Sequence, residues 1–131
     1  MIKINFIFDK TKSSLNFKKL ILKSYFNHPP QKANCIVVAG GDGFMLQTVK
    51  KNYKYNKPFY GINCGTYGFL MNKLPKKNLM TKIKKAKKLI INPIKIKAVD
   101  LKNKKINLIA VNEASLFRQS RQTASIQVIA N

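Results

Sequence analysis

The stretch CIVVAGGDGF, residues 35–44, decides the fold of this chain. Its first five residues form a short, continuous apolar run, which is typical of a parallel strand buried on both faces. A glycine cluster follows, and a helix is predicted over 44–53 because Met45, Val49 and Tyr53 recur at helical spacing. A strand, a glycine-rich turn and a helix in this order predict an open α/β sheet, with a ligand-binding edge at the carboxyl ends of its strands.

The same alternation of strand and helix extends to both sides of this stretch. Ser13-Ser14 are predicted to cap the first helix, and His28-Pro29-Pro30 to end it. The strand–helix order, found three times, predicts a doubly wound parallel sheet in a Rossmann-like α/β domain over residues 1–92. The predicted elements are strands over 3–8, 35–39 and 59–63 and helices over 15–25, 44–53 and 76–89.

Downstream of the predicted α/β domain, the apolar residues change from helical to alternating spacing. Strands are predicted over 94–99, 106–111 and 125–129, with no helix between them. We therefore expect a boundary near Asn92 and the start of a β-rich domain over 93–131. Three strands bury little apolar surface by themselves, so this second domain is expected to be incomplete.

The chain has a formal net charge of +22, from 26 Lys and Arg against 4 Asp and Glu. Only Arg118 and Arg121 are arginines, whereas proteins dedicated to nucleic acids generally recruit arginine for bidentate contacts. The lysines are spread along the chain and accompany many Asn and Ile residues, whose codons are also AT-rich. We therefore ascribe the charge to genomic composition rather than to a nucleic-acid surface. A positive field still attracts phosphorylated small molecules.

No apolar run reaches the roughly 20 residues that a membrane-spanning helix needs, and the apolar start of the chain is too short for a secretory signal. Cys35 and Cys64 stand far apart and match no zinc-binding or redox spacing. The sequence therefore predicts a cytoplasmic protein with free thiols and no membrane partner, and no side chain is assigned as a metal ligand.

All six glycines lie between positions 40 and 68, in two clusters that each follow a predicted strand. Such clusters are expected to let the backbone adopt positive φ and to let a phosphate approach closely, near the N–H groups that open the next helix. The pattern is neither a P-loop nor the G-x-G-x-x-G dinucleotide fingerprint. Two tight turns without a ligand are the alternative. The clusters are Gly40, Gly41 and Gly43, and Gly61, Gly65 and Gly68.

Asp42 lies within the first glycine cluster and is one of only four acidic residues. Beside a phosphate, a carboxylate suits a partner of Mg²⁺ or the acceptor of a hydroxyl proton. Because phosphoryl transfer has a loose transition state, a weak base that orients the hydroxyl is sufficient. Asp42 as the N-cap of the following helix is the structural alternative, and one side chain could serve both purposes.

Asn112 and Glu113 directly follow the predicted strand over 106–111. An Asn-Glu pair can accept hydrogen bonds from ribose hydroxyls and can bond an amide or a base. A surface turn is the more common origin of this pattern. The other acids, Asp9 and Asp100, are predicted to be strand-end or turn residues.

Three segments together resemble the successive N-terminal motifs of NAD kinases. They are VAGGDG at 38–43, YGINCGTYGFL at 60–70 and AVNE at 110–113. The second segment distinguishes the chain from lipid kinases, which tend to have Gly-Thr-Gly-Asn-Asp there. The resemblance implies transfer of the terminal phosphate of ATP, or of polyphosphate, to the 2′-hydroxyl of the adenosine ribose of NAD, giving NADP.

The resemblance also implies a role for each residue that matches a motif. Asp42 takes the position of the proton acceptor. The implied binding residues are Gly40 and Gly41 for the phosphate donor with Mg²⁺, Gly43 for NAD, Phe69 for packing against the dinucleotide, and Asn112 and Glu113 for its ribose and nicotinamide portion.

NAD kinases continue into a β-rich second domain with a further Asp and a Gly-Ser-Thr-Ala-type segment, neither of which this sequence contains. The chain is therefore expected to be a truncated member of the family, and the full-length enzyme to be a homo-oligomer. The alternatives are a non-catalytic or split nucleotide-binding fragment of such an enzyme and, third, a basic nucleic-acid-binding protein.

Overall fold

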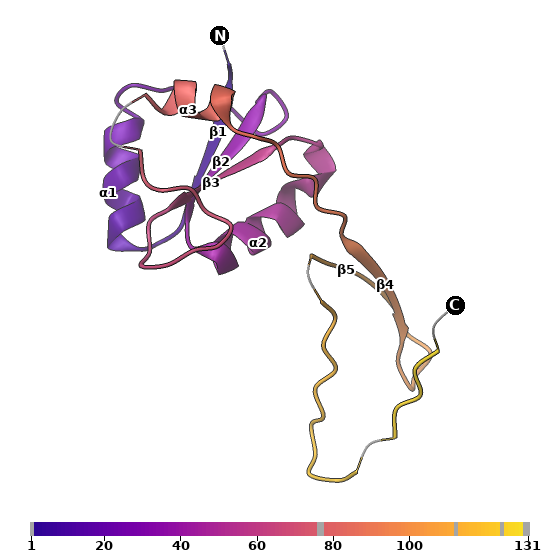
Figure 1. Cartoon of the computed structure of the whole chain (residues 1–131). Helices are drawn as coiled ribbons and strands as arrows, with labels where there is room; N and C mark the ends of the chain where they lie inside the picture. Colours follow the sequence, from indigo (N-terminus) through magenta and orange to yellow (C-terminus); the bar gives the residue numbers. More distant parts are fainter. Residues whose placement is uncertain (1, 76–77, 112, 124, 130–131) are drawn as a thin grey trace. The chain divides into compact units, whose positions relative to one another are not determined.

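The computed structural model describes residues 2–75, 78–111, 113–123 and 125–129. The chain divides into two compact units, Met1–Ile90 and Ile91–Asn131, and each is described by itself (Figure 1). None of the described helices has the length and the apolar character that crossing a membrane requires.

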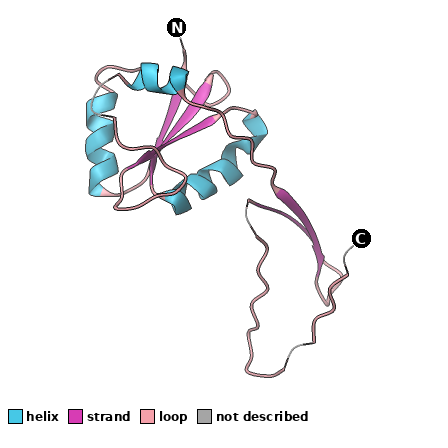
Figure 2. Cartoon of the chain, viewed as in Figure 1, coloured by secondary structure: helices cyan, strands magenta, loops and turns pink. Residues whose placement is uncertain are grey.

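The first unit is built on a sheet of three parallel strands in the order β1-β2-β3 (Figure 2). These strands are β1 (Ile4–Phe8), β2 (Cys35–Gly40) and β3 (Phe59–Asn63). Every residue of the central strand β2 is buried, which explains why its sequence is a continuous apolar run. The predicted parallel α/β sheet is confirmed.

Helices cover both faces of this sheet. On one face, Phe17 of α1 (Lys12–Ile21) and Leu79 of α3 (Leu79–Lys85) pack against Phe6, Val37 and Ile62. On the other face, Met45 of α2 (Asp42–Asn52) packs against Ile36 and Val38. Alternate residues of β2 therefore belong to two separate apolar clusters. The short 3₁₀ turn Tyr53–Tyr55 follows α2 and leads toward β3.

The two crossover connections of the sheet have opposite hands. Because β2 lies between β1 and β3, both connections step across the sheet in the same direction. The first runs through α1 on one face and the second through α2 on the other face. Nearly all β-α-β connections are right-handed, so this pair is unusual. The chain thus leaves β1 toward one face of the sheet and leaves the neighbouring strand β2 toward the other face.

The outer edge of β1 is covered by the segment around Asn27, through that side chain and through a backbone N–H group. Asn27 Oδ1 accepts a hydrogen bond from the Phe6 backbone N–H at 2.7 Å, and Asn27 Nδ2 donates to the Phe6 carbonyl at 3.2 Å. The His28 N–H donates to the Ile4 carbonyl at 2.9 Å. The segment around residue 27 thus saturates an edge that would otherwise present unpaired backbone groups.

Replacing Asn27 with Ala is expected to destabilise the fold by about 1–3 kcal/mol, because two backbone groups of Phe6 lose their partners. Urea unfolding followed by far-UV circular dichroism measures the change. Asn16→Ala, at an exposed position of α1, is the control and should leave the midpoint nearly unchanged. Equal midpoints for the two variants would show that the Asn27 amide does not stabilise this edge.

The first helix differs from its prediction at both ends. It begins at Lys12, and its N-cap is Thr11, whose side-chain oxygen accepts a hydrogen bond from the Ser14 N–H at 3.3 Å. Ser14 is fully buried, and its hydroxyl donates to the Ala39 carbonyl at 2.9 Å. The predicted cap at Ser13-Ser14 is therefore wrong, because tertiary bonding occupies the hydroxyl. The helix also ends at Ile21, well before the prolines.

The third helix is shorter than the predicted span of 76–89, of which residues 76–77 lie outside the described part of the chain. Helix α3 covers Leu79–Lys85, and Ala86 is already extended. Leu89 and Ile90 are more than four-fifths exposed, so no packing extends the helix toward them. The basic residues from Lys82 onward repel one another, which adds a further cost to a longer helix.

The second unit contains an antiparallel hairpin of β4 (Ile94–Val99) and β5 (Lys105–Ala110). Asp100 Oδ1 accepts hydrogen bonds from the N–H groups of Lys102 at 2.9 Å and Lys104 at 2.8 Å, which fixes the turn between the strands. The predicted third strand over 125–129 is wrong, since none of these residues belongs to a described ladder. Alternating apolar residues form a strand only where a partner strand accepts their hydrogen bonds.

Candidate functional site at the carboxyl edge of the sheet

The backbone at the end of β2 is not strained, contrary to the expected positive φ of its glycines. All six glycines are described and none has a positive φ. Gly41 is the N-cap of α2, with φ −106° and ψ 178°. The left-handed positions belong instead to Asn56, Asn78 and Asn103, residues that tolerate this conformation. The glycines at this edge therefore serve something other than turn geometry.

These glycines differ in how much room the structure leaves for a side chain at their positions. A Cβ on Gly40 would lie 2.8 Å from both Asp9 Oδ2 and Phe44 Cδ1, so these side chains leave no room for one unless they shift. At Gly41 and Gly43, no described atom lies within 4 Å of such a Cβ. Neither φ nor a described neighbour requires glycine at these two positions. Open space beside the N-terminus of α2 is what close approach of an anion needs.

Asp42 joins the two glycine-rich segments directly. Its Oδ2 accepts a hydrogen bond from the Phe69 N–H at 2.8 Å, and its Oδ1 accepts one from the Leu70 N–H at 3.1 Å. Asp42 is the first residue of α2, where a negative charge is favoured by the helix dipole. The N-cap alternative is wrong, because Gly41 occupies the cap and the Asp42 side chain bonds the other segment instead.

The second glycine-rich segment is fixed to the sheet at both of its ends. The Cys64 N–H donates to the Gly40 carbonyl at 3.0 Å, which ties its start to the end of β2. Asn72 then returns alongside β3, where its N–H donates to the Gly61 carbonyl at 2.9 Å. Between these ties, the Phe69 side chain is fully exposed. Its backbone is thus held by Asp42 while its ring remains available for contact.

Asp9 also lies at this edge, although the sequence indicated only a strand-end residue. Its N–H donates to the Ala39 carbonyl at 3.0 Å, and its Oδ1 accepts hydrogen bonds from the Thr11 N–H at 2.9 Å and hydroxyl at 2.6 Å. The carboxylate occupies the space beside Gly40. The signal that could have placed it is its position directly after the strand that neighbours β2.

The structure brings five of the seven predicted site residues to one edge of the sheet in the first unit. Glu113 belongs to the second unit and is exposed there. Asn112 lies outside the described residues. The residues that lie together at the end of β2 and in the second segment are Gly40, Gly41, Asp42, Gly43 and Phe69.

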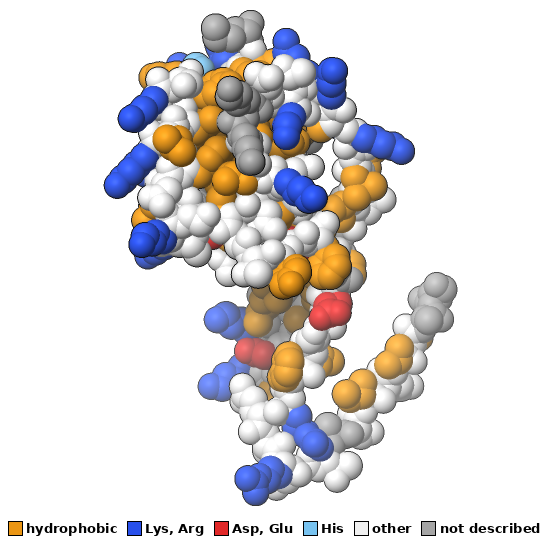
Figure 3. All heavy atoms as spheres, turned by 60° about the vertical axis from the view of Figure 1, so that its left-hand side comes forward, with side chains coloured by type: hydrophobic (Ala, Val, Ile, Leu, Met, Phe, Trp, Pro, Cys, Tyr) orange, Lys and Arg blue, Asp and Glu red, His pale blue; other side chains and the backbone are white. Residues whose placement is uncertain are grey.

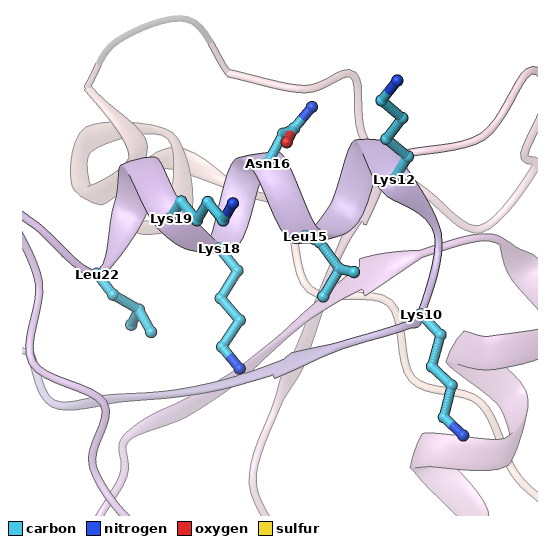
Figure 4. Close-up of a pocket in the computed structure, with 7 residues that line it drawn as sticks. All are labelled: Lys10, Lys12, Leu15, Asn16, Lys18, Lys19 and Leu22. Atoms are coloured by element: carbon cyan, nitrogen blue, oxygen red, sulfur yellow. The ribbon is translucent and has the colours of Figure 1, made fainter.

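Two surface depressions lie on the first unit, and neither is lined by Asp42. One, of about 740 Å³, is lined by Lys10, Lys12, Lys18 and Lys19, by Leu15 and Asn16 of α1, and by Leu22, the C-cap of this helix. The lysine side chains point in different directions in Figure 4 and do not converge on one anion. Figure 3 likewise shows the basic side chains of the visible face scattered rather than gathered into a stripe.

The described residues offer no protein-only metal cage, since they contain no group of three or more His, Cys, Asp and Glu side chains. Asp42 does have acceptor capacity beyond its two backbone bonds, because a carboxylate has about four lone-pair sites. This donor set fits a Mg²⁺ ion that is held mainly by substrate phosphates.

Both cysteines are buried thiols that form no disulfide. Burial raises the pKa of Cys35 from 9.0 to about 11, and the nearby charge of Lys88 opposes the shift only in part. Burial also raises the pKa of Cys64, and a hydrogen bond with Ser14, which lowers this pKa, opposes the rise only in part. Neither thiol is therefore activated as a nucleophile at neutral pH.

The raised pKa of Cys35 predicts that stability falls as the pH rises from 9 to about 11. The unfolded thiol ionises in this window while the folded thiol keeps its proton, which costs the folded state roughly 2 kcal/mol by the top of the window. Urea midpoints across the window, compared with Cys35→Ala to cancel the titration of lysines, measure the effect. Parallel pH dependences of the two proteins would contradict it.

Sequence comparison identifies the relatives of this chain. The family model described as ATP-NAD kinase N-terminal domain matches residues 6–87. The NAD kinase of Rhizobium meliloti (strain 1021) is 41% identical over 105 residues, which are 80% of this chain and 41% of that protein. The NAD kinase of Rickettsia felis is 36% identical over 129 residues, which are 98% of this chain and 51% of that protein. The NAD kinase of Brucella suis biovar 1 is 38% identical over 125 residues, or 95% of this chain and 49% of that protein.

This chain thus spans about half the length of the curated relatives it matches. The match includes both glycine-rich segments and the strands that lead into them. On the extent of the family match and the identity to these relatives, the chain belongs to the NAD kinase family.

Proposed function

We propose that this chain carries the phosphate-transfer edge of an NAD kinase, which moves the terminal phosphate of ATP, or of polyphosphate, to the 2′-hydroxyl of the adenosine ribose of NAD. The observation that supports this most is the position of the Asp42 carboxylate, which follows the end of β2 and bonds the second glycine-rich segment from within the first. Membership of the family supports the choice of nucleotides.

In this proposal the backbone receives the phosphates and Asp42 orients the acceptor. Gly41 and Gly43 leave open space beside the first N–H groups of α2, which carry partial positive charge. The remaining lone pairs of Asp42 accept the proton of the 2′-hydroxyl, so that its oxygen points at the phosphorus. The transition state is loose, and such orientation with weak basicity is sufficient.

The other assigned residues complete the nucleotide contacts in this proposal. A Mg²⁺ ion, when bound, would be held mainly by the phosphates of the donor beside Asp42 and would neutralise part of their charge. The exposed ring of Phe69 packs against the dinucleotide, and Gly40 sets the shape of the donor side through its packing on Asp9. Asn112 and Glu113 bind the ribose and the nicotinamide portion of NAD.

A second candidate is a nucleotide-binding part that needs further polypeptide for turnover. The observation that favours it is the coverage of only about half of each relative. In that case the chain binds ATP or NAD but forms no NADP by itself.

Two measurements on the purified chain test these candidates. NADP formation from NAD and ATP with Mg²⁺, read by a coupled dehydrogenase, supports the kinase. Calorimetric binding of either nucleotide without turnover supports the second candidate. No binding of either nucleotide contradicts both. Nucleic-acid binding with a steep salt dependence would support the third hypothesis instead. Polyphosphate use, the cytoplasmic location and homo-oligomers stay predictions.

A further inference from the structure

We infer that Gly68 and the backbone amides of Phe69 and Leu70 form a positioning device for Asp42, with Gly68 as a positioning residue for the proposed transfer. This inference rests on the proposed function. It goes beyond the motif assignments, in which Gly68 has no role and Asp42 is treated as a carboxylate that acts alone.

The device has two hydrogen bonds that fix both oxygens of one carboxylate. The Phe69 and Leu70 N–H groups reach Oδ2 and Oδ1 at 2.8 and 3.1 Å. Two bonds to two different oxygens remove rotation of the carboxylate plane, and they leave the other lone pair of each oxygen available. The direction in which Asp42 can accept a hydroxyl proton is therefore set by the second glycine-rich segment, not by α2 alone.

The space beside Gly68 is tight, so a side chain there would disturb this arrangement. A Cβ at Gly68 would lie 3.1 Å from Asp42 Oδ1 and 3.2 Å from Met71 Cβ. Contacts this short force a neighbour to move by a few tenths of an ångström. Met71 Cβ is fixed to the backbone, so the carboxylate or the segment that begins at Phe69 must give way. The φ of Gly68 is not positive, so alanine brings no backbone strain of its own.

The same segment provides a matched control at Gly65. A Cβ there would lie 3.5 Å from Asn63 Oδ1, which is an ordinary contact. The Gly65 N–H bond to Asn63 Oδ1, at 2.8 Å, does not depend on the missing side chain. Gly65→Ala and Gly68→Ala therefore make the same chemical change in the same segment, and only the second disturbs Asp42.

Amide hydrogen exchange, measured by NMR on the full 131-residue chain, tests the device independently of turnover. The Phe69 and Leu70 amides are expected to be protected in the wild type and in Gly65→Ala. In Gly68→Ala their exchange should be at least about tenfold faster, because their acceptor is displaced. Wild-type protection of both amides in Gly68→Ala would overturn the inference, whatever the enzymatic activity.

Steady-state kinetics then tests whether the device positions a reacting group. Gly68→Ala is expected to lower kcat by about 10- to 100-fold while the KM for NAD changes less than about threefold, since misplacing a reacting group acts on the transition state. Lost amide protection with an unchanged kcat would overturn the positioning role. A wild-type chain without NAD binding or turnover would refute the proposed function and this role with it, and would leave Asp42 as a purely structural tie.

Discussion

Replacing Asp42 with Asn is expected to lower NADP formation by about 10²- to 10⁴-fold, the range that a positioned proton acceptor contributes. An amide cannot accept the hydroxyl proton. In asparagine an NH₂ group replaces one of the two carboxylate oxygens. This donor faces the N–H of Phe69 or of Leu70, so one of the two observed hydrogen bonds is lost. The coupled dehydrogenase assay measures the rate.

Asp100→Asn is the matched control for this substitution. Asp100 also accepts two backbone N–H bonds, from Lys102 and Lys104, but it lies in the hairpin turn of the second unit. We expect this variant to keep wild-type kcat. If Asp42→Asn instead retained the wild-type rate, Asp42 would not be the proton acceptor, and its two hydrogen bonds would be structural only.

Replacing Gly43 with Ala is expected to move stability and binding in opposite directions. Gly43 lies in the first turn of α2 without positive φ, and a Cβ there would meet no described atom within 4 Å, so alanine should stabilise the fold by about 0.5–1 kcal/mol. The added methyl would occupy the space proposed for the nucleotide. Binding of NAD or ATP should weaken by about 100-fold, as expected for overpacking of roughly 3 kcal/mol. Urea unfolding and calorimetry measure the two effects.

Gly40→Ala provides the contrast, because its new methyl would collide with Asp9 and Phe44 rather than with a ligand. Its fold should lose about 1–3 kcal/mol. A Gly43→Ala protein that binds nucleotide as well as the wild type would show that this opening is not used by a ligand.

The sequence was most informative where local pattern and burial agree. The continuous apolar run at β2 and the span of β3 were predictable because a doubly covered strand tolerates little else. The convergence of Gly40–Gly43 and the second segment followed from parallel topology, since carboxyl ends of parallel strands share one edge. Those inferences required no side-chain geometry.

The remainder depended on contacts that no local pattern contains. Ser14 looks like a helix cap, but its hydroxyl is used by Ala39 across the core. Asp42 looks like a cap or a lone base, but its carboxylate bonds amides that are 27 and 28 residues away. The opposite hands of the crossovers were equally hidden, because an apolar helix stripe does not tell which face of the sheet it will cover.

The amide of Asn27 has a consequence for self-assembly. Because it already bonds both backbone groups of Phe6, a second copy cannot add a strand there without first displacing it. Growth of a continuous sheet through β1, the simplest route to fibres or to a strand-swapped pair, is therefore obstructed. Copies of this unit that associate through this side must therefore do so by side-chain packing. The dissociation constant of such a dimer should depend on the apolar area that it buries, not on backbone hydrogen bonds between strands.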